Sequence, residues 1–261
     1  MDIDQSTAIV TGAASGLGEA TAIMLAQMGA KVALWDINGA LAQEVSSRIN
    51  QTLGKPVSLV VPCDITNTDS VQAALTQTQN TLGHPRILMN IAGVGSAKRL
   101  ISKEGVAAPL EDFTRVIHIN LIGTYNVIRL FAAECAKLSP LIDQERGVIV
   151  MTASAAAYEG QIGQEAYSAS KGGLVSMTLP MARDLAQHGI RVCSIAPGLF
   201  ATPLMKTLPP ATQASLAGAI PFPKRLGEPD EFASLACHIV SNRHLNGEVI
   251  RLDGALRMAP Q

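Results

Sequence analysis

The fold is decided by the stretch Thr11-Gly12-Ala13-Ala14-Ser15-Gly16-Leu17-Gly18. It follows the apolar run Ala8-Ile9-Val10 and opens a helical pattern over residues 20–28, so the order of elements is strand, glycine turn, helix. Gly12 permits a tight turn, Gly16 lets the backbone approach a pyrophosphate, and Gly18 lets the helix pack closely on the strand. The N-terminus of the helix then faces the negative charge. Glycines are also ordinary loop residues, but here the flanking strand and helix favour a dinucleotide site.

An acidic residue ends the next apolar run, Lys31-Val32-Ala33-Leu34-Trp35. Asp36 lies about 20 residues past the turn, where a carboxylate can hold the adenosine ribose through its hydroxyls. A carboxylate there repels a 2′-phosphate, and the two positions where a basic residue would restore phosphate binding, Ser15 and Ile37, carry no charge. The pattern favours NAD over NADP, against the alternative that Asp36 only ends a strand as a turn residue.

A tyrosine precedes a lysine by four positions in Tyr167-Ser168-Ala169-Ser170-Lys171, which puts both side chains on one face of a helix. A free tyrosine titrates near pH ~10, and a nearby ammonium favours the phenolate and lowers that pKa. The pair suits alcohol oxidation or carbonyl reduction. The same spacing also arises by chance as a surface tyrosine beside a solvated lysine, so the rest of the chain decides between the two.

Length and composition suit one α/β domain over residues 1–261, because 48% of the residues are hydrophobic and only 16% are charged. A formal net charge of −1 with scattered basic residues gives no basic face, so nucleic acid is not expected as the main partner. No uninterrupted apolar stretch reaches the ~18 residues that cross a bilayer, and the amino terminus lacks signal character. We therefore expect no membrane partner and a cytoplasmic location, or an organellar one reached with a leader that has been removed.

The four cysteines are far apart and form no Cys-x-x-Cys, and the five histidines are dispersed without a metal-ligand spacing. Neither a metal site nor a redox pair is therefore expected. Buried free thiols are the simpler interpretation of the cysteines.

Seven apolar runs alternate with helical segments, near residues 7–11, 31–35, 57–61, 87–90, 147–151, 190–195 and 248–251. This alternation predicts a Rossmann-type, doubly wound parallel sheet with helices on both faces, in which ligands bind outside the carboxyl ends of the strands. Two long loops, 95–109 and 197–229, interrupt the alternation. We expect both to border the substrate pocket, the alternative being plain surface excursions.

Across essentially the whole chain these residues resemble the short-chain dehydrogenase/reductase family. The shared motifs, in the family's order and spacing, are the turn Thr11 to Gly18, Asp36, Cys63-Asp64-Ile65, Asn90-Ile91-Ala92-Gly93, Asn120, Ser154, Tyr167 with Lys171, and Pro197-Gly198. Ile91 departs from the pattern at a tolerant position where many members carry a second asparagine. Residues 152–161, 167–173, 195–200 and 251–258 are similar to one branch of the family, the type 2 3-hydroxyacyl-CoA dehydrogenases, also called 17β-hydroxysteroid dehydrogenases type 10.

The resemblance implies four catalytic residues. Tyr167 would be the acid/base that removes the hydroxyl proton of the substrate, and Ser154 would hydrogen-bond the reacting oxygen. Lys171 would contact the nicotinamide ribose and lower the pKa of Tyr167, while Asn120 would support a water relay to solvent. The implied substrate contacts are Ser154, Gln161 and Tyr167.

The resemblance also implies the residues that hold the cofactor. They are Gly12, Ser15, Gly16, Leu17, Gly18, Asp36, Asp64, Ile65, Asn90, Ile91, Gly93, Tyr167, Lys171, Pro197, Leu199, Phe200 and Thr202. Asp64 and Ile65 would lie at the adenine. Asn90, Ile91 and Gly93 would line the adenosine side, and Leu199, Phe200 and Thr202 the nicotinamide side.

Together, these features predict NAD-dependent, reversible oxidation of a 3-hydroxyacyl-CoA to a 3-oxoacyl-CoA. Lys98, Arg99 or Lys103 would meet the phosphates of coenzyme A, or be simply solvated. Two alternatives remain: a dehydrogenase of another secondary alcohol such as a hydroxysteroid, and a non-catalytic dinucleotide-binding scaffold, which has no need of the four catalytic residues. Members of the family usually form dimers or tetramers, so a homo-oligomer is expected, in which residues 232–240 and the last strand pack either across a two-fold axis or within the subunit.

Overall fold

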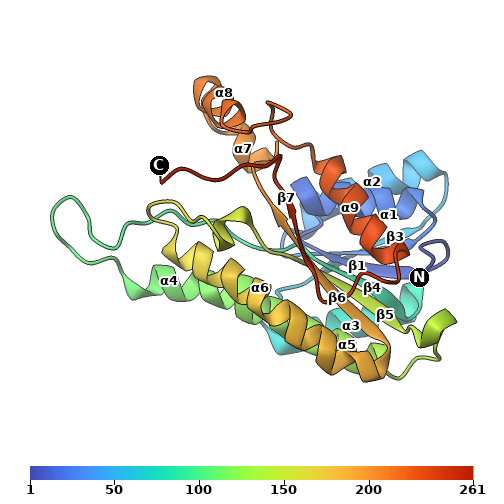
Figure 1. Ribbon diagram of the computed structural model, residues 1–261. Helices are drawn as coiled ribbons and strands as arrows, with labels where there is room; N and C mark the ends of the chain where they lie inside the picture. The colour runs from blue at the N-terminus through green and yellow to red at the C-terminus, as the bar shows by residue number, and fades with distance from the viewer. Residues whose placement is uncertain (261) are drawn as a thin grey trace.

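A parallel sheet of seven strands forms the centre of the structure, a computed structural model that describes residues 1–260 and their side chains except those of Leu204 and Lys206 (Figure 1). The strands are β1 (Thr7–Thr11), β2 (Lys31–Asp36), β3 (Ser58–Pro62), β4 (Pro85–Asn90), β5 (Gly147–Thr152), β6 (Ile190–Pro197) and β7 (Val249–Leu252). Their order across the sheet is β3-β2-β1-β4-β5-β6-β7, and neighbouring strands are parallel. The predicted fold class is confirmed.

Helices cover both faces of the sheet (Figure 1). One layer holds α1 (Gly16–Gln27), α2 (Gly39–Leu53) and α9 (Pro229–Ser241), and the other holds α3 (Thr68–Leu82), α5 (Thr124–Cys135) and α6 (Glu165–Leu185). The remaining helices are α4 (Leu110–Ile117), η1 (His118–Gly123), η2 (Ile142–Gln144), η3 (Ala155–Ala157), η4 (Ala186–His188), α7 (Pro203–Lys206) and α8 (Pro210–Gly218).

The core divides into two apolar clusters, one on each face of the sheet. Ala8 and Val10 of β1 pack with α1 and α9, whereas Ile9, between them in sequence, packs with α3, α5 and α6. This follows because successive strand residues point to opposite faces. A strand covered on both faces needs apolar residues at every position, which explains the continuous apolar runs in the sequence.

The apolar residues of α9 are buried within the subunit. Phe232, Ile239 and Val240 are fully shielded from solvent, and α9 packs along α1. Of the two arrangements expected for residues 232–240, packing across a two-fold axis or within the subunit, the structure shows packing within the subunit.

The strand order reverses at β1, which lies between β2 and β4. The chain proceeds from β1 to β2 and β3 on one side, then returns to place β4 on the other side. In such sheets a crevice opens beyond the carboxyl ends of the strands at this point. The glycine turn follows β1 directly and so lies at the crevice.

One helical stretch among residues 1–260, Leu110–Cys135, is long and apolar enough by composition to cross a membrane. It comprises α4, η1 and α5, and 50% of its apolar window is buried inside the protein. There α4 packs against α6, and α5 packs against α3 and β4. The buried part of the stretch therefore serves the core of the domain.

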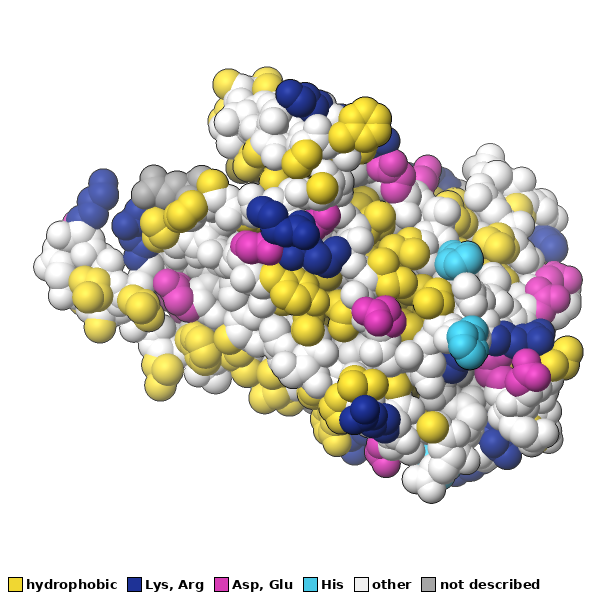
Figure 2. All heavy atoms as spheres, in the orientation of Figure 1, with side chains coloured by type: hydrophobic (Ala, Val, Ile, Leu, Met, Phe, Trp, Pro, Cys, Tyr) yellow, Lys and Arg dark blue, Asp and Glu magenta, His cyan; other side chains and the backbone are white. Residues whose placement is uncertain are grey.

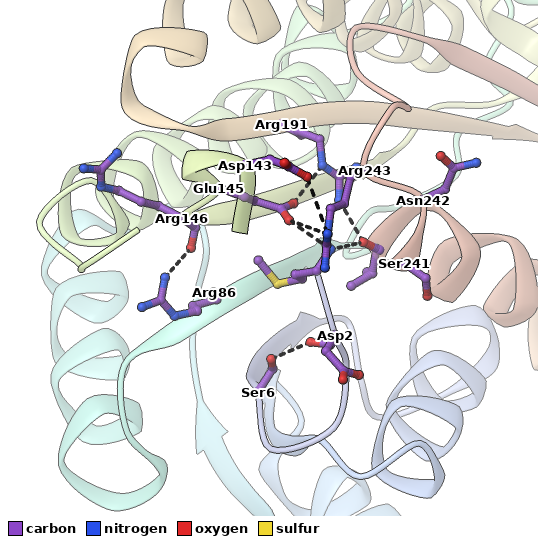
Figure 3. A network of polar contacts seen from close by, with 12 residues as sticks. Asp2, Ser6, Arg86, Asp143, Glu145, Arg146, Arg191, Ser241, Asn242 and Arg243 are labelled. Carbon is purple, nitrogen blue, oxygen red and sulfur yellow. Dashed lines mark hydrogen bonds and ion pairs between the residues drawn. The ribbon is translucent and has the colours of Figure 1, made fainter. Parts of the chain in front are cut away.

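A buried ion network lies at the amino ends of β5 and β6, away from the crevice (Figure 3). The carboxylate of Glu145 accepts a hydrogen bond from Nε of Arg191 at 2.8 Å and pairs with the N-terminal ammonium of Met1 at 2.9 Å. Arg191 also donates to the main-chain oxygens of Ile239, Val240 and Leu245. These contacts fix the end of the sheet opposite the crevice.

All four cysteines are buried and free, as expected. Burial raises the pKa of the Cys63 thiol to about 11 and the pKa values of Cys135 and Cys237 to about 12. It also raises the pKa of Cys193. The thiols are therefore protonated at neutral pH.

Candidate active site

Close contacts at Gly12 and Gly18 leave no room for a side chain in the glycine turn. Gly12 has a φ of +67°, and a Cβ there would lie 2.8 Å from the Cα of Ala92. A Cβ on Gly18 would overlap the carbonyl oxygen of Gly12, so α1 packs directly on the turn. Gly16, at a φ of +57°, lies beside Thr202 and Pro203. Ser15, the N-cap residue of α1, makes no side-chain hydrogen bond to the first turn, which leaves the N–H groups there open to an anion.

Buried hydrogen bonds join the carboxyl ends of β1 and β4 at the crevice. Thr11 Oγ1 donates to Asn90 Oδ1 at 3.1 Å and accepts from the N–H groups of Ile91 and Ala92 at 3.0 and 3.1 Å. Asn90 Nδ2 donates to the carbonyl of Thr124 at 3.2 Å. Asn90 is only 2% exposed, so it ties β4 to β1 and α5 rather than lining the adenosine side as expected.

A cavity of about 400 Å³ lies beside the turn. The expected cofactor residues that line it are Gly12, Ser15, Gly16, Leu17, Gly18, Asp36, Asp64, Ile65, Ile91, Gly93 and Thr202. Ile37, expected beside the 2′-phosphate position, also lines it, and the lining residues outside the expected set are Trp35, Cys63, Thr66, Ala92, Val94, Ile119 and Pro203. Most of these adjoin an expected residue at the carboxyl end of a strand, which is the signal that would have found them.

Backbone N–H groups fix the carboxylate of Asp36 at this cavity. Its Oδ2 accepts from the N–H of Ala14 in the glycine turn at 3.0 Å, and its Oδ1 accepts from the N–H of Asn38 at 2.8 Å. No lysine or arginine is among the described residues that line the cavity. The close-packed turn, the open helix N-terminus and this carboxylate fit a nicotinamide dinucleotide.

Six expected cofactor residues do not line this cavity: Asn90, Tyr167, Lys171, Pro197, Leu199 and Phe200. Phe200 is 5% exposed and packs edge-to-face on Phe232, with ring centroids 6.4 Å apart. Leu199 and Phe200 line a separate cavity of about 190 Å³, and Pro197 is buried at the end of β6. The sequence could not reveal this because an apolar side chain after a strand packs in the core as readily as against a cofactor.

The tyrosine, lysine and serine meet between α6 and the end of β5. Lys171 Nζ donates to the carbonyl of Thr152 at 2.6 Å and lies 5.8 Å from the ring centroid of Tyr167. Ser154 Oγ accepts from the N–H of Ala156 at 3.1 Å, which caps the short helix η3 and orients the serine. A serine hydroxyl and a phenol are thus held together beside a buried ammonium.

The protonation of this group differs from the expectation. Burial raises the pKa of Tyr167, and its hydrogen bond with Ser154 opposes the rise only in part. Burial also lowers the pKa of Lys171 to about 8. Lys171 therefore does not depress the pKa of Tyr167 below its ordinary value here, because its ammonium bonds to Thr152 and the burial of the phenol dominates.

Asn120 lies in the π-helical turn η1, where it is fully buried. Its Oδ1 accepts from the N–H of Val94 at 2.8 Å, and its Nδ2 donates to the carbonyl of Val94 at 2.9 Å and to Ser170 Oγ at 3.2 Å. The amide clamps the segment after β4 against α6. Turns of this kind are frequent at functional sites.

Gln161 does not point at the reacting group. Its Nε2 donates to the carbonyl of Ala259 in the C-terminal segment at 3.1 Å, and its N–H donates to Oε1 of Gln164 at 3.0 Å. The expected contact with substrate is replaced by a contact with the end of the chain.

Gly93 of the cavity wall lies beside Asn120 and Lys171, so the dinucleotide crevice adjoins a half-buried tyrosine and a buried lysine, serine and asparagine. This arrangement defines a nicotinamide-dependent oxidoreductase. The chain belongs to the short chain dehydrogenase family, whose model matches residues 6–213.

Relatives and solved structures are similar over nearly the whole chain. The 3-hydroxyacyl-CoA dehydrogenase type-2 of Bos taurus is 52% identical over 254 residues, which cover 97% of this chain and 95% of that protein. The crystal structure of 3-hydroxyacyl-CoA dehydrogenase type-2 from Mycobacterium avium has a TM-score of 0.91 and 42% identity, with 100% of both chains covered. A 7α-hydroxysteroid dehydrogenase complexed with NADH and 7-oxo glycochenodeoxycholic acid has a TM-score of 0.88 and 30% identity, covering 98% of this chain and 96% of that one.

The lowered pKa of Lys171 predicts a pH dependence of stability. The pKa of the Lys171 ammonium is about 10.5 in the unfolded chain and about 8 in the folded chain. Between pH 8 and 10.5 the unfolded state therefore binds more protons than the folded state. The contribution of Lys171 to the free energy of unfolding therefore rises with pH, by at most about 1.4 kcal/mol per pH unit. Urea unfolding of the wild type and Lys171→Met between pH 8 and 10 is expected to show a smaller rise in the variant; identical slopes would contradict the assignment.

Proposed function

We propose that this protein oxidises a 3-hydroxyacyl-CoA thioester to the 3-oxoacyl-CoA, reversibly and with NAD as the hydride acceptor. The observation that carries the chemistry is the meeting of Ser154, Tyr167 and Lys171 at the end of β5, where Lys171 lies beside Gly93 of the dinucleotide crevice. The identity of 52% to a full-length protein named for this reaction supports the substrate class.

Bound NAD supplies a hydride acceptor, and the residues of the chain position the alcohol and move its proton. Ser154 orients the reacting oxygen, and the Tyr167 phenolate takes the hydroxyl proton as hydride leaves the same carbon. In reduction, the phenol returns the proton to the oxygen. Because burial keeps Tyr167 protonated at neutral pH, higher pH favours oxidation and lower pH favours reduction.

NAD is preferred over NADP in this proposal because of Asp36. Its carboxylate, fixed by Ala14 and Asn38, adds negative charge where a 2′-phosphate would lie. Ser15 and Ile37, which line the same cavity, supply no positive charge in compensation.

The coenzyme A moiety is assigned to the loop 95–109, which projects from the molecule as a tongue (Figure 1). Two hydrogen bonds fold it back on itself, from Ser102 N–H to the Val106 carbonyl at 2.8 Å and from Ala108 N–H to the Leu100 carbonyl at 2.9 Å. Figure 2 shows basic and apolar side chains gathered on this part of the surface.

The three basic residues of the tongue are not equivalent. Lys98 Nζ pairs with Asp112 at 2.6 Å, so its charge is already balanced. Arg99 and Lys103 are exposed to solvent. We therefore assign the phosphates of coenzyme A to Arg99 and Lys103.

The proposal is tested by measuring NADH formation from linear and 2-methyl-branched 3-hydroxyacyl-CoA thioesters, a hydroxysteroid and a neutral secondary alcohol, each with NAD and with NADP. The expected result is the highest kcat/KM with a thioester and NAD. Activity with the steroid alone would reject the acyl-CoA assignment and favour the alternative suggested by the 7α-hydroxysteroid dehydrogenase at a TM-score of 0.88.

An Arg99→Ala/Lys103→Ala variant extends this test. Loss of two exposed phosphate contacts is expected to raise KM for the thioester about tenfold, at a typical charge-assisted bond strength, and to leave KM for the neutral alcohol unchanged. Lys31→Ala/Lys55→Ala, at exposed positions outside the tongue, is the matched control. Equal changes for both substrates would remove the tongue from coenzyme A binding.

We also propose that the protein forms a homo-oligomer through the face of α4 and α5. Leu110 and Phe113 of α4, Ile122 of η1 and Tyr125 of α5 are 71%, 42%, 48% and 50% exposed. Exposed apolar surface of this kind marks interaction sites. Sedimentation velocity is expected to give the mass of a dimer or tetramer, reduced by Phe113→Glu; a wild-type monomer at micromolar concentration would contradict the proposal.

A further inference from the structure

Arg251, in the last strand, joins several parts of the chain through one guanidinium group. Its Nη1 and Nη2 donate to the two carboxylate oxygens of Glu159 at 2.7 and 2.8 Å, and its Nε donates to Asp253 at 2.7 Å. Nη2 also donates to the carbonyl of Leu256 at 3.1 Å, and the guanidinium lies 5.0 Å from the ring centroid of Tyr158. The side chain is thus held by two carboxylates, a carbonyl and an aromatic ring.

Glu159 belongs to the 158–164 loop, which begins just after Ser154 and η3 and ends at the start of α6. Its own N–H donates to the carbonyl of Ala155 at 3.0 Å. A Cβ on Gly160 would overlap Ser168, the neighbour of Tyr167 in α6. A displacement of this loop would therefore shift both η3, which follows Ser154, and the first turn of α6, which carries Tyr167.

The same loop supports the tongue. The carbonyl of Gly163 accepts from the N–H of Lys98 at 2.7 Å, and a Cβ on Gly163 would lie 3.1 Å from that nitrogen. The position of the 158–164 loop therefore sets where the tongue leaves the body of the protein.

The C-terminal segment, residues 253–260, runs from β7 toward the side from which the tongue projects (Figure 1). It covers the 158–164 loop through two hydrogen bonds, from Gln161 Nε2 to the Ala259 carbonyl at 3.1 Å and from Ile162 N–H to the Pro260 carbonyl at 3.0 Å. At its other end, the carbonyl of Gly254 accepts from the N–H of Phe222 at 3.4 Å, next to the segment that carries α7 and α8.

We propose that Arg251 is a positioning residue for the substrate side of the active site. Through Glu159 and Asp253 it locks the C-terminal segment onto the 158–164 loop, and this locked pair sets the width of the substrate entrance between Ser154 and the tongue. The role of Arg251 in thioester binding rests on the function proposed above.

The geometry requires arginine in particular. A guanidinium presents parallel N–H groups that match both oxygens of Glu159, and a third N–H remains for Asp253. Lysine keeps the charge but cannot make this fork. The side chains of Arg251, Glu159 and Asp253 are 21%, 26% and 7% exposed, so the cluster is more protected than a typical surface ion pair.

The test compares Arg251→Lys with Arg225→Lys. Arg225 makes a similar bidentate pair with Glu231, at 2.8 Å for both contacts, but on the exposed surface at the start of α9. For Arg251→Lys we expect KM for the preferred substrate to rise at least fivefold while the Kd for NADH changes less than twofold. Glu159→Gln is expected to produce the same split, and combining it with Arg251→Lys should add little.

A second readout does not depend on the substrate. Hydrogen exchange at the amide of Ile162, which is protected by the Pro260 carbonyl, is expected to accelerate at least tenfold in Arg251→Lys and to stay unchanged in Arg225→Lys. Unchanged exchange would overturn the proposal, as would equal losses of substrate and NADH binding. If the wild type oxidises no thioester, the proposed function fails, but the exchange experiment still decides whether Arg251 locks the loop.

Discussion

Replacing Tyr167 by phenylalanine is expected to lower kcat roughly 10²- to 10⁴-fold, the usual contribution of a positioned acid/base. Only the hydroxyl is removed, so the packing of α6 and the hydrogen bond from Lys171 to Thr152 at 2.6 Å are retained. The Kd for NADH, measured by fluorescence titration, is expected to stay within a few-fold of the wild type. The loss should therefore appear in turnover and not in cofactor binding.

Tyr125→Phe is the matched control, because it removes a phenol from α5 at a position that is 50% exposed in the single chain. Tyr125 lies on the face proposed to join subunits, and phenylalanine keeps the apolar ring there. It is expected to keep wild-type kcat. A Tyr167→Phe variant that binds NADH and turns over at the full rate would overturn the catalytic assignment and favour the scaffold alternative.

Gly18→Ala is expected to weaken NADH binding about 10- to 100-fold. The added Cβ would overlap the carbonyl oxygen of Gly12 and lie 3.2 Å from the Cα of Ala13, so α1 and the glycine turn must separate. Overpacking of this kind typically costs about 1–3 kcal/mol, and each 1.4 kcal/mol corresponds to a tenfold change in Kd. Isothermal titration with NADH measures the effect directly.

The control for this variant is Gly218→Ala at the end of α8, where a Cβ has no neighbour within 4 Å. It adds the same methyl group and is expected to leave the Kd unchanged. Wild-type affinity in Gly18→Ala would show that the turn does not need its close contact with α1.

The sheet was the most predictable part of the molecule. Residues 147–151, for example, were expected to form a strand, and β5 spans Gly147–Thr152. The reason is physical: a parallel strand buried on both faces must be apolar throughout, so its pattern is legible without tertiary information. Lys171 and Tyr167 were predictable for a similar reason, because helical spacing alone places them on one face. The cytoplasmic location stays a prediction.

The parts that escaped prediction depend on contacts between distant segments. Gln161 was expected at the substrate, but the partner of its side chain is Ala259, 98 residues away in sequence. Phe200 was expected at the nicotinamide, but Phe232 of α9 draws it into the core. The pKa of Tyr167 was expected to fall, but burial, which no local pattern encodes, raises it.

Because all four native thiols are buried, a cysteine introduced on the surface can be labelled selectively. Cys63, Cys135 and Cys237 have pKa values raised to about 11 or 12, and Cys193 is raised as well, so none is an accessible thiolate at neutral pH. A cysteine engineered at an exposed tongue position such as Ser102 would therefore react selectively with a maleimide dye. A fluorophore attached there would report whether substrate binding changes the surroundings of the tongue, and the native cysteines would not have to be removed first.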